Sequence, residues 1–237
     1  MRPVNSITQG AVLLDHRDAK PDLVAVMGEF CCYCERALEA RDLHVEHIKP
    51  QIGHPKVALT WGNFLLACTT CNTYKRHYQG SGKQIGILSK QAWPHLDNTF
   101  LLFDYDKHGR MRVASSIANT AYTAMADSTL QMAGLSRTPA VSATYEQLGL
   151  DYDSTSRRAK AWRKANTALN AFLQNPTDIQ IQSIADQAEE VGFFSIWMRV
   201  FDSHAAVKRK LVQVFKASSV CFDANASAVS PRQPGRI

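Results

Sequence analysis

The sequence predicts an α+β protein in which a short, metal-stabilised strand–strand–helix unit precedes a mostly α-helical region. Four cysteines form two pairs with the spacing Cys-x2-Cys, Cys31/Cys34 and Cys68/Cys71. The segment between the pairs contains a stretch that alternates like a β-strand. Beyond about residue 117 the chain is rich in alanine, and apolar residues recur at helical spacing. Together these patterns favour a small metal-bound motif followed by packed helices.

Five consecutive segments are expected in the 237 residues. They are an N-terminal extension (1–24), the cysteine-bearing motif (25–85), a hairpin or connector (86–116), a helical region (117–222) and a disordered tail (223–237). The tail is predicted to be disordered because its Ser, Asn, Pro and Gly residues leave little apolar surface to bury.

Composition and charge exclude few classes. The formal net charge is +6, the pI is about 9.0 and 45% of residues are hydrophobic. This basic excess suits a polyanionic partner without proving one. The first 13 residues contain neither a long apolar run nor a secretory cleavage site, and the most apolar stretch, 192–201, is too short to span a bilayer. We therefore expect a cytoplasmic location, where cysteines are more often metal ligands than disulfides.

Strand and helix signals follow one another around the cysteines. Leu43–Glu46 alternates and predicts a first strand, and the aromatic and apolar run Trp61–Leu66 predicts a second. Thr69 can start a helix in which Asn72, Lys75 and Arg76 share one face, since they lie three and four residues apart. The metal would fix the start of this helix relative to the first strand.

The second half of the chain predicts a hairpin and several helices. Phe100–Tyr105 and Met111–Ala114 flank a turn at 106–109. Helices are expected over Ser154–Gln174, after Thr177, and over His204–Phe215. The first of these carries an apolar stripe of Trp162, Ala165, Leu169, Phe172 and Leu173. Opposite the stripe lie Arg157, Lys160 and Lys164, a pattern typical both of a solvated helix face and of nucleic-acid contact.

The four paired cysteines are candidate ligands of a structural Zn²⁺ ion, because two such knuckles make a tetrahedral four-thiolate site. Cys31 and Cys32 are adjacent, but only Cys31 leaves two residues before Cys34. Cys32 and Cys221 are therefore outside the set, and Cys221 is expected to be a small buried hydrophobe. The alternative of four packed free thiols is disfavoured, since two independent pairs rarely arise by chance.

A carboxylate, a histidine and an amide accompany the cysteines in a layout suited to phosphodiester hydrolysis. His47 can act as a general base because imidazole titrates near neutral pH. Glu46 and Asn72 offer oxygen ligands for one catalytic divalent cation, Mg²⁺ or Mn²⁺. Lys75 and Arg76 are expected to bind phosphate groups of the nucleic acid.

The pattern resembles the HNH (ββα-metal) endonuclease family. The residues that carry the resemblance are VEHIKP (45–50) and WGNFLLACTTCNTYKR (61–76), between and around the two cysteine pairs. The resemblance implies that His47 is the general base, that Glu46 and Asn72 hold the catalytic ion, and that Asn63 holds the loop and orients the histidine. The family often has Asp or His where this chain has Glu46, and the longer side chain leaves the metal preference open.

Residues 28–35, 45–50 and 61–76 are also similar to the HNH subunit of Septu-type antiphage systems and its retron-associated relatives, and residues 97–100, 130–137 and 192–201 fit it more loosely. That resemblance implies a nuclease effector held by a partner ATPase of the SMC/ABC-like kind, docked through the helical region. Phe193, Phe194, Trp197 and Phe201 look exposed there, and we expect about half of them to close the protein's own core and the rest to serve docking.

Three other functions use the same residues differently. A stand-alone restriction-type endonuclease would cut DNA without a partner. An RNA-cleaving effector, for example one that cuts tRNA, remains open because the site reads a phosphodiester and not a sugar. A non-enzymatic zinc module that binds nucleic acid would need the cysteines but not Glu46, His47 and Asn72 together.

Overall fold

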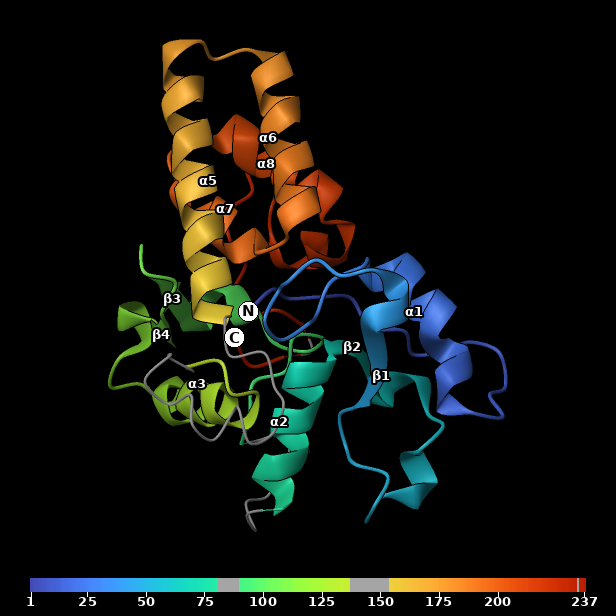
Figure 1. Ribbon diagram of the computed structural model, residues 1–237. Coiled ribbons are helices and arrows are strands. Elements are labelled where there is room, and N and C mark those ends of the chain that lie inside the picture. Colours follow the sequence, from blue (N-terminus) through green and yellow to red (C-terminus); the bar gives the residue numbers. More distant parts are fainter. Residues whose placement is uncertain (81–89, 137–153, 234) are drawn as a thin grey trace.

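The computed structural model describes residues 1–80, 90–136, 154–233 and 235–237. The end of the predicted cysteine-bearing motif, 81–85, lies outside this part of the chain. The fold is α+β, as predicted: two two-stranded antiparallel sheets are combined with helices (Figure 1). The first half contains α1 (Lys20–Met27), β1 (Leu43–His47), β2 (Phe64–Cys68), α2 (Thr69–Gly80), β3 (Phe103–Tyr105), β4 (Met111–Val113) and α3 (Ala121–Met132). The second half contains α5 (Ser154–Gln174), α6 (Asp178–Val191), α7 (Phe194–Val200) and α8 (Ala205–Val214).

The β1–β2 hairpin and α2 form the strand–strand–helix unit. The two strands pair so that Leu43 lies opposite Cys68 and His47 lies opposite Phe64. Strand β2 begins later than predicted, because Trp61–Asn63 forms a 3-10 turn before it. Helix α2 follows β2 without a linker and packs on both strands. The end of β1 that carries Glu46 and His47 therefore faces one side of α2.

The apolar residues form two main clusters, one in each part of the molecule. One cluster joins the N-terminal segment, the strand–strand–helix unit, the β3–β4 hairpin and α3. The other joins α5, α6, α7 and α8, which we call the helical lobe. Figure 1 shows this lobe at one end of the molecule and β1, β2 and α2 at the other, with both chain ends between them. No helix in the described ranges is long and apolar enough to cross a bilayer.

Glu35, which directly follows Cys34, connects these two parts through its side chain. Its carboxylate is buried and accepts hydrogen bonds from the Tyr105 hydroxyl of β3 at 2.6 Å and from the Ser195 N–H of α7 at 2.8 Å. It also pairs with the ammonium group of Met1 at 2.9 Å. A buried carboxylate needs such partners to offset the loss of water. One side chain therefore ties the first cysteine pair to the hairpin and to the helical lobe.

The backbone reinforces the same junction. The carbonyl oxygen of Glu35 accepts a hydrogen bond from the Phe193 N–H at 2.8 Å. Gly192, just before it, has φ of 78°, and a Cβ there would lie 2.4 Å from the Glu35 oxygen and 2.6 Å from the Ala37 nitrogen. Both the positive φ and the close approach require glycine at this position. The helical lobe thus rests directly on the backbone beside the cysteines.

The prediction of a disordered tail is wrong. Arg232 is buried and donates from its guanidinium to the carbonyl oxygens of Pro94 and Val4, at 2.7 and 2.8 Å. Arg236 pairs with the buried carboxylate of Asp97 at 2.9 Å. The composition is poor in apolar residues, as the prediction assumed, but these two arginines satisfy buried acceptors in the first half of the chain. Hydrogen bonds and an ion pair of the arginines, and not apolar burial, hold the tail in place.

The prediction that some of the aromatics around α7 are exposed is also wrong. Phe193, Phe194, Trp197 and Phe201 are all at most 3% exposed. Helix α7 is short and is surrounded by α5, α6 and α8, so it is apolar on nearly every side. These side chains close the lobe's own core and give no evidence for a docking surface. Leu173, predicted to lie in the buried stripe of α5, is instead 58% exposed.

Candidate active site

The four paired cysteines meet in one buried cluster. Their sulfur atoms all lie within 4.8 Å of one another, and the Cys34 and Cys68 sulfurs are 3.9 Å apart. Four buried thiols at this separation could hold a metal ion. Cys32 lies outside the cluster, with its sulfur 3.8 Å from that of Met27, which confirms Cys31 as the ligand candidate. Cys221 is buried in the helical lobe, as predicted.

The local fold explains why the sulfurs converge. Cys68 ends β2 and Cys71 lies in the first turn of α2, where the Cys71 N–H points at the Cys68 sulfur at 3.4 Å. Cys31 and Cys34 lie in a tight turn closed by the hydrogen bond from the Glu35 N–H to the Cys31 carbonyl. Hydrogen bonds from the other three thiols hold the pKa of Cys34 well below its usual range. Burial raises the pKa of Cys31 well above its usual range, so the four thiols do not all ionise by themselves, and a divalent cation would stabilise them as thiolates.

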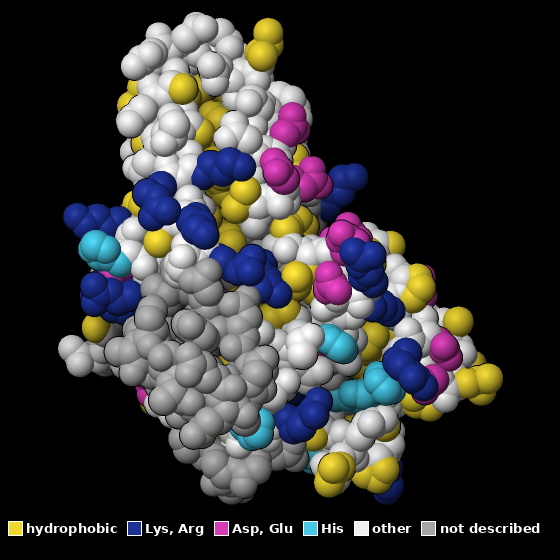
Figure 2. Space-filling model, viewed as in Figure 1, with side chains coloured by type: hydrophobic (Ala, Val, Ile, Leu, Met, Phe, Trp, Pro, Cys, Tyr) yellow, Lys and Arg dark blue, Asp and Glu magenta, His cyan; other side chains and the backbone are white. Residues whose placement is uncertain are grey.

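A separate cavity of about 280 Å³ opens beside the end of β1 and the exposed side of α2. Its polar lining consists of His16, Glu46, His47, Gln51, Asn72, Lys75 and Arg76. Figure 2 shows histidine, Lys and Arg side chains together on this face of the molecule. The structure thus brings the predicted base, both predicted oxygen ligands and the predicted phosphate contact of α2 into one cavity.

His47 lines this cavity, and one of its two ring nitrogens is engaged by the backbone. Its Nε2 lies 2.9 Å from the carbonyl oxygen of Ala58, and because a carbonyl can only accept, Nε2 carries the hydrogen. In the neutral ring, Nδ1 then keeps a lone pair that can accept a proton. Burial lowers the pKa of His47, so the neutral form is favoured near neutral pH. The ring also packs edge-on against Phe64, which fixes its plane.

Asn63 lies outside the cavity and holds the loop between β1 and β2. Its Oδ1 accepts from the Lys49 N–H at 2.7 Å, and its Nδ2 donates to the carbonyls of Lys49 and Val57 at 3.0 and 3.1 Å. The side chain is buried and its amide contacts the start and the middle of the loop. This loop supplies the Ala58 carbonyl that orients His47. Asn63 therefore acts on His47 only through the backbone.

Lys75 does not lie on the outer face of α2, and its assignment as a phosphate ligand is wrong. Its side chain is 4% exposed, its ammonium group pairs with Oε1 of Glu46, and it donates to the His47 carbonyl. Residues 72, 75 and 76 do share one side of the helix, but position 75 faces β1. Arg76 is exposed and lines the cavity, so its contact with phosphate stays a prediction.

The Glu46 and Asn72 side chains fit a divalent cation despite this ion pair. Within the described ranges, the Glu46 carboxylate has two partners, the Lys75 ammonium and the Tyr33 hydroxyl. Both contact Oε1, so Oε2 is left for a ligand. Burial raises the pKa of Glu46, and the Lys75 ammonium opposes this shift. Glu46 Oε2 and the Asn72 amide oxygen are hard donors lining one cavity. With two protein donors, water and phosphate would complete the shell, as Mg²⁺ prefers.

Comparison with known families assigns this region. Residues 31–77 match the family model described as HNH endonuclease. This segment is an HNH domain. The match begins at the first cysteine of the cluster and ends within α2, so it contains the four sulfur ligands, Glu46, His47, Asn63 and Asn72.

A curated relative from Vibrio cholerae serotype O1 biovar El Tor is named as an HNH endonuclease of retron Vc95. It is 31% identical over 87 residues, which cover 35% of this chain and 42% of the relative. The chain therefore aligns with less than half the length of that relative.

One residue of the cavity, His16, was not identified from the sequence. It lies in the 3-10 turn His16–Ala19, before the HNH domain, and its ring centroid is 4.8 Å from that of His47. No spacing rule links a single histidine to a motif so much later in the chain. Only the packing of the N-terminal segment against β1 brings the two rings together.

The basic residues of α5 are not part of this cavity. Arg157, Lys160 and Lys164 are exposed, as predicted, but none of them lines it. The Lys164 ammonium lies 4.0 Å from Glu190 of α6. Their contact with nucleic acid therefore stays a prediction.

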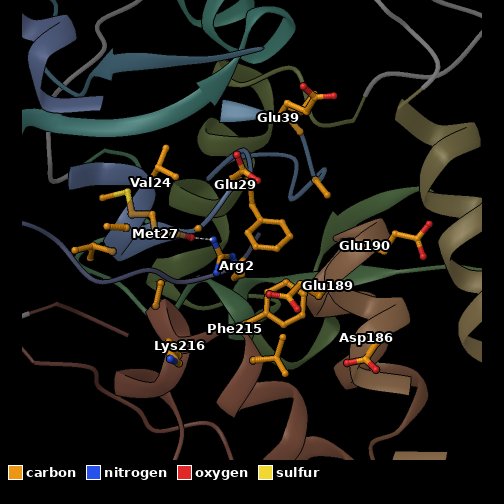
Figure 3. A pocket seen from close by; sticks show the side chains of 18 residues that line it. Arg2, Val24, Met27, Glu29, Glu39, Asp186, Glu189, Glu190, Phe215 and Lys216 are labelled. Carbon is orange, nitrogen blue, oxygen red and sulfur yellow. Dashed lines mark hydrogen bonds between the residues drawn. The ribbon is translucent and has the colours of Figure 1, made fainter. Parts of the chain in front are cut away.

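A larger cavity of about 900 Å³ lies between the HNH domain and the helical lobe (Figure 3). Arg2 lies at its base, with its guanidinium over the rings of Phe30 and Phe215 and a 2.6 Å hydrogen bond to the Met27 carbonyl. Five carboxylates line it: Glu29, Glu39, Asp186, Glu189 and Glu190. This charge would repel a polyanion, so the smaller cavity is the better candidate for nucleic acid.

Proposed function

We propose that this protein is a metal-dependent endonuclease that hydrolyses phosphodiester bonds of nucleic acid at its HNH domain. The observation that carries the proposal is the single cavity shared by His47, Glu46, Asn72 and Arg76. The match to the HNH endonuclease family supports it. A zinc module that only binds nucleic acid would have no need for a buried carboxylate beside a histidine with an open ring nitrogen.

The reaction follows from the position of each group. Nδ1 of His47 takes a proton from a water molecule, and the water oxygen attacks phosphorus. The Ala58 carbonyl holds the ring in the tautomer that this step needs. Arg76 at the rim binds a neighbouring phosphate and positions the strand. A divalent cation held by Glu46 and Asn72 would supply electrostatic stabilisation of the leaving 3′ oxygen.

The cysteine cluster has a different role in this proposal. Thiolates prefer zinc, whereas carboxylate and amide oxygens prefer Mg²⁺ or Mn²⁺. We therefore assign Zn²⁺ to Cys31, Cys34, Cys68 and Cys71 as a structural ion. The two metals should differ in how readily a chelator removes them.

Brief treatment with EDTA is expected to stop cleavage without unfolding the protein. The oxygen site offers two hard protein donors and binds its ion weakly, while the four-thiolate site holds zinc tightly. Cleavage of supercoiled plasmid and of tRNA should fall about 100-fold or more and return on addition of Mg²⁺ or Mn²⁺. Zinc content and the melting temperature, measured on the same samples, should not change. Cleavage that persists in metal-stripped buffer would contradict the proposed mechanism.

We also propose that the nuclease is the effector of an antiphage system and works with an ATPase of the SMC/ABC-like kind. The retron named in the relative from Vibrio cholerae supports the defence role. Among the residues that the structure describes, none from the helical lobe lines the cavity of the HNH domain, and we assign partner binding to this lobe. The buried aromatics of α7 do not support docking. The proposal of an ATPase partner therefore rests only on the resemblance to the Septu-type HNH subunit.

Co-expression with an ATPase encoded beside this chain is expected to give one complex on size-exclusion chromatography. Cells that carry both proteins should resist phage, and a His47→Ala variant should remove resistance without disturbing the complex. The plasmid and tRNA assays then separate DNA from RNA as the substrate. A protein that never co-elutes with the ATPase, yet cuts DNA alone, would favour the stand-alone restriction-type endonuclease.

A further inference from the structure

We propose that His16, which lies before the HNH domain, is a second imidazole of the active site and binds the scissile phosphate beside His47. This inference rests on the proposed nuclease function. It would make the N-terminal segment part of the catalytic unit, although the family match begins only at residue 31.

The position of the ring is the first support. The His16 and His47 ring centroids are 4.8 Å apart and the ring planes are tilted by 54°, so the two imidazoles are in direct contact. Both line the cavity that also holds Glu46 and Asn72. The His16 side chain is 29% exposed, which leaves it open to a substrate that enters the cavity.

The orientation of the ring is the second support. Nδ1 of His16 lies 3.3 Å from a carboxylate oxygen of Asp15, with which it forms an ion pair when the ring is protonated. Asp15 is itself fixed, because it pairs with Arg17 at 2.7 Å and forms a capping box with Asp18. Nε2 of His16 has no hydrogen-bond partner among the residues that the structure describes. It is therefore the nitrogen that a phosphate oxygen can reach.

The segment that carries His16 is held in place by its own apolar residues. Leu13 and Ala19, on either side of the histidine, are buried in the same cluster as β1 and β2. The 3-10 turn packs against both α1 and β1. His16 is thus fixed from both sides and is not carried on a free chain end.

The two histidines can play different roles because their surroundings differ. His47 has Nε2–H fixed on a carbonyl and presents a lone pair at Nδ1, which suits a base. His16 has Nδ1 beside a carboxylate, and its Nε2 becomes an N–H donor when the ring is protonated. Negative charge grows on the non-bridging phosphate oxygens as water attacks, so a donor placed there stabilises the transition state more than the substrate.

The test compares His16→Ala, His16→Gln and His108→Ala in the full-length protein. His108 is an exposed histidine in the turn between β3 and β4 and does not line the cavity, so it serves as the control. Steady-state cleavage of an oligonucleotide at saturating Mn²⁺ gives kcat and KM, and thermal melting reports the fold. We expect His16→Ala to lower kcat about 100-fold with little change in KM, as for other donors to a developing oxyanion.

The glutamine variant separates binding of phosphate from structural support of His47. Its side-chain amide can donate a hydrogen bond from near the position of Nε2, so it should recover about tenfold of the lost rate if His16 is a phosphate donor. Equal loss in the alanine and glutamine variants, with lowered melting temperatures, would overturn the inference in favour of a packing role. Activity of His16→Ala equal to that of His108→Ala would overturn it as well. A wild type that cuts no substrate, either alone or with the co-expressed ATPase, would instead refute the proposed nuclease function.

Discussion

Replacing His47 with alanine is expected to abolish phosphodiester cleavage while the fold and the bound zinc survive. General-base catalysis accounts for up to about 10⁴-fold in rate, and no other imidazole described in the cavity is held by a carbonyl in the tautomer that frees a lone pair. The side chain is only half-buried and is separate from the cysteine cluster. Cleavage rate, circular dichroism and zinc content of the variant should be measured together.

His44 offers a matched control on the same strand. It is exposed, its Nε2 lies 2.9 Å from the Thr69 hydroxyl, and it does not line the cavity. The His44→Ala variant should therefore keep nearly full activity. Undiminished cleavage by His47→Ala, with divalent metal present, would remove His47 from the mechanism.

Serine in place of Cys34 or Cys71 is expected to prevent folding. A structural zinc site contributes roughly 10 kcal/mol or more, and a whole domain is stable by only about 5–15 kcal/mol. Loss of the ion would also leave three buried thiols and a serine hydroxyl together without a ligand that they all contact. Soluble yield, melting temperature and zinc content are the measurements that check this.

Cys32→Ser tests whether the effect belongs to the cluster and not to any buried cysteine. Cys32 is adjacent to a ligand and fully buried, but its sulfur lies against Met27 and outside the set of four. This variant should lose some stability, since a buried hydroxyl costs about 1–3 kcal/mol, yet keep its zinc. Unaltered melting of the Cys34 and Cys71 variants, with a wild type that binds no zinc, would refute the four-cysteine site.

Local patterns in the sequence were sufficient to predict β1, α5 and the grouping of the four cysteines, which depend on near neighbours. The alternation of 43–46 and the periodicity of 154–174 correspond to β1 and α5. The spacing Cys-x2-Cys selected Cys31 over Cys32, because the geometry of a metal knuckle is set within four residues. His47 and Asn72 likewise follow from their places in a short motif.

Features that depend on packing between distant segments could not be predicted in this way. Helical spacing places Lys75 beside Asn72 but does not show which part of that face rests on β1, so the ion pair with Glu46 was not anticipated. The contact of His16 with His47 and the anchoring of the tail by Arg232 depend on segments far apart in the chain. Their sequence surroundings contain no pattern that indicates either contact.

The hydrogen bonds of Glu35 bear on how the molecule unfolds. The residue that holds the helical lobe and the β3–β4 hairpin is the immediate neighbour of Cys34, so the tight turn that the proposed zinc ion would hold also sets the position of its carboxylate. Release of the metal would free this turn and, with it, the backbone of residues 35–37 against which Gly192 packs. The two apolar clusters should therefore lose their structure in one cooperative transition. A shortened protein that keeps only the HNH domain would expose a buried carboxylate and much of the surface beneath the lobe, and it would not be a faithful substitute for the whole chain.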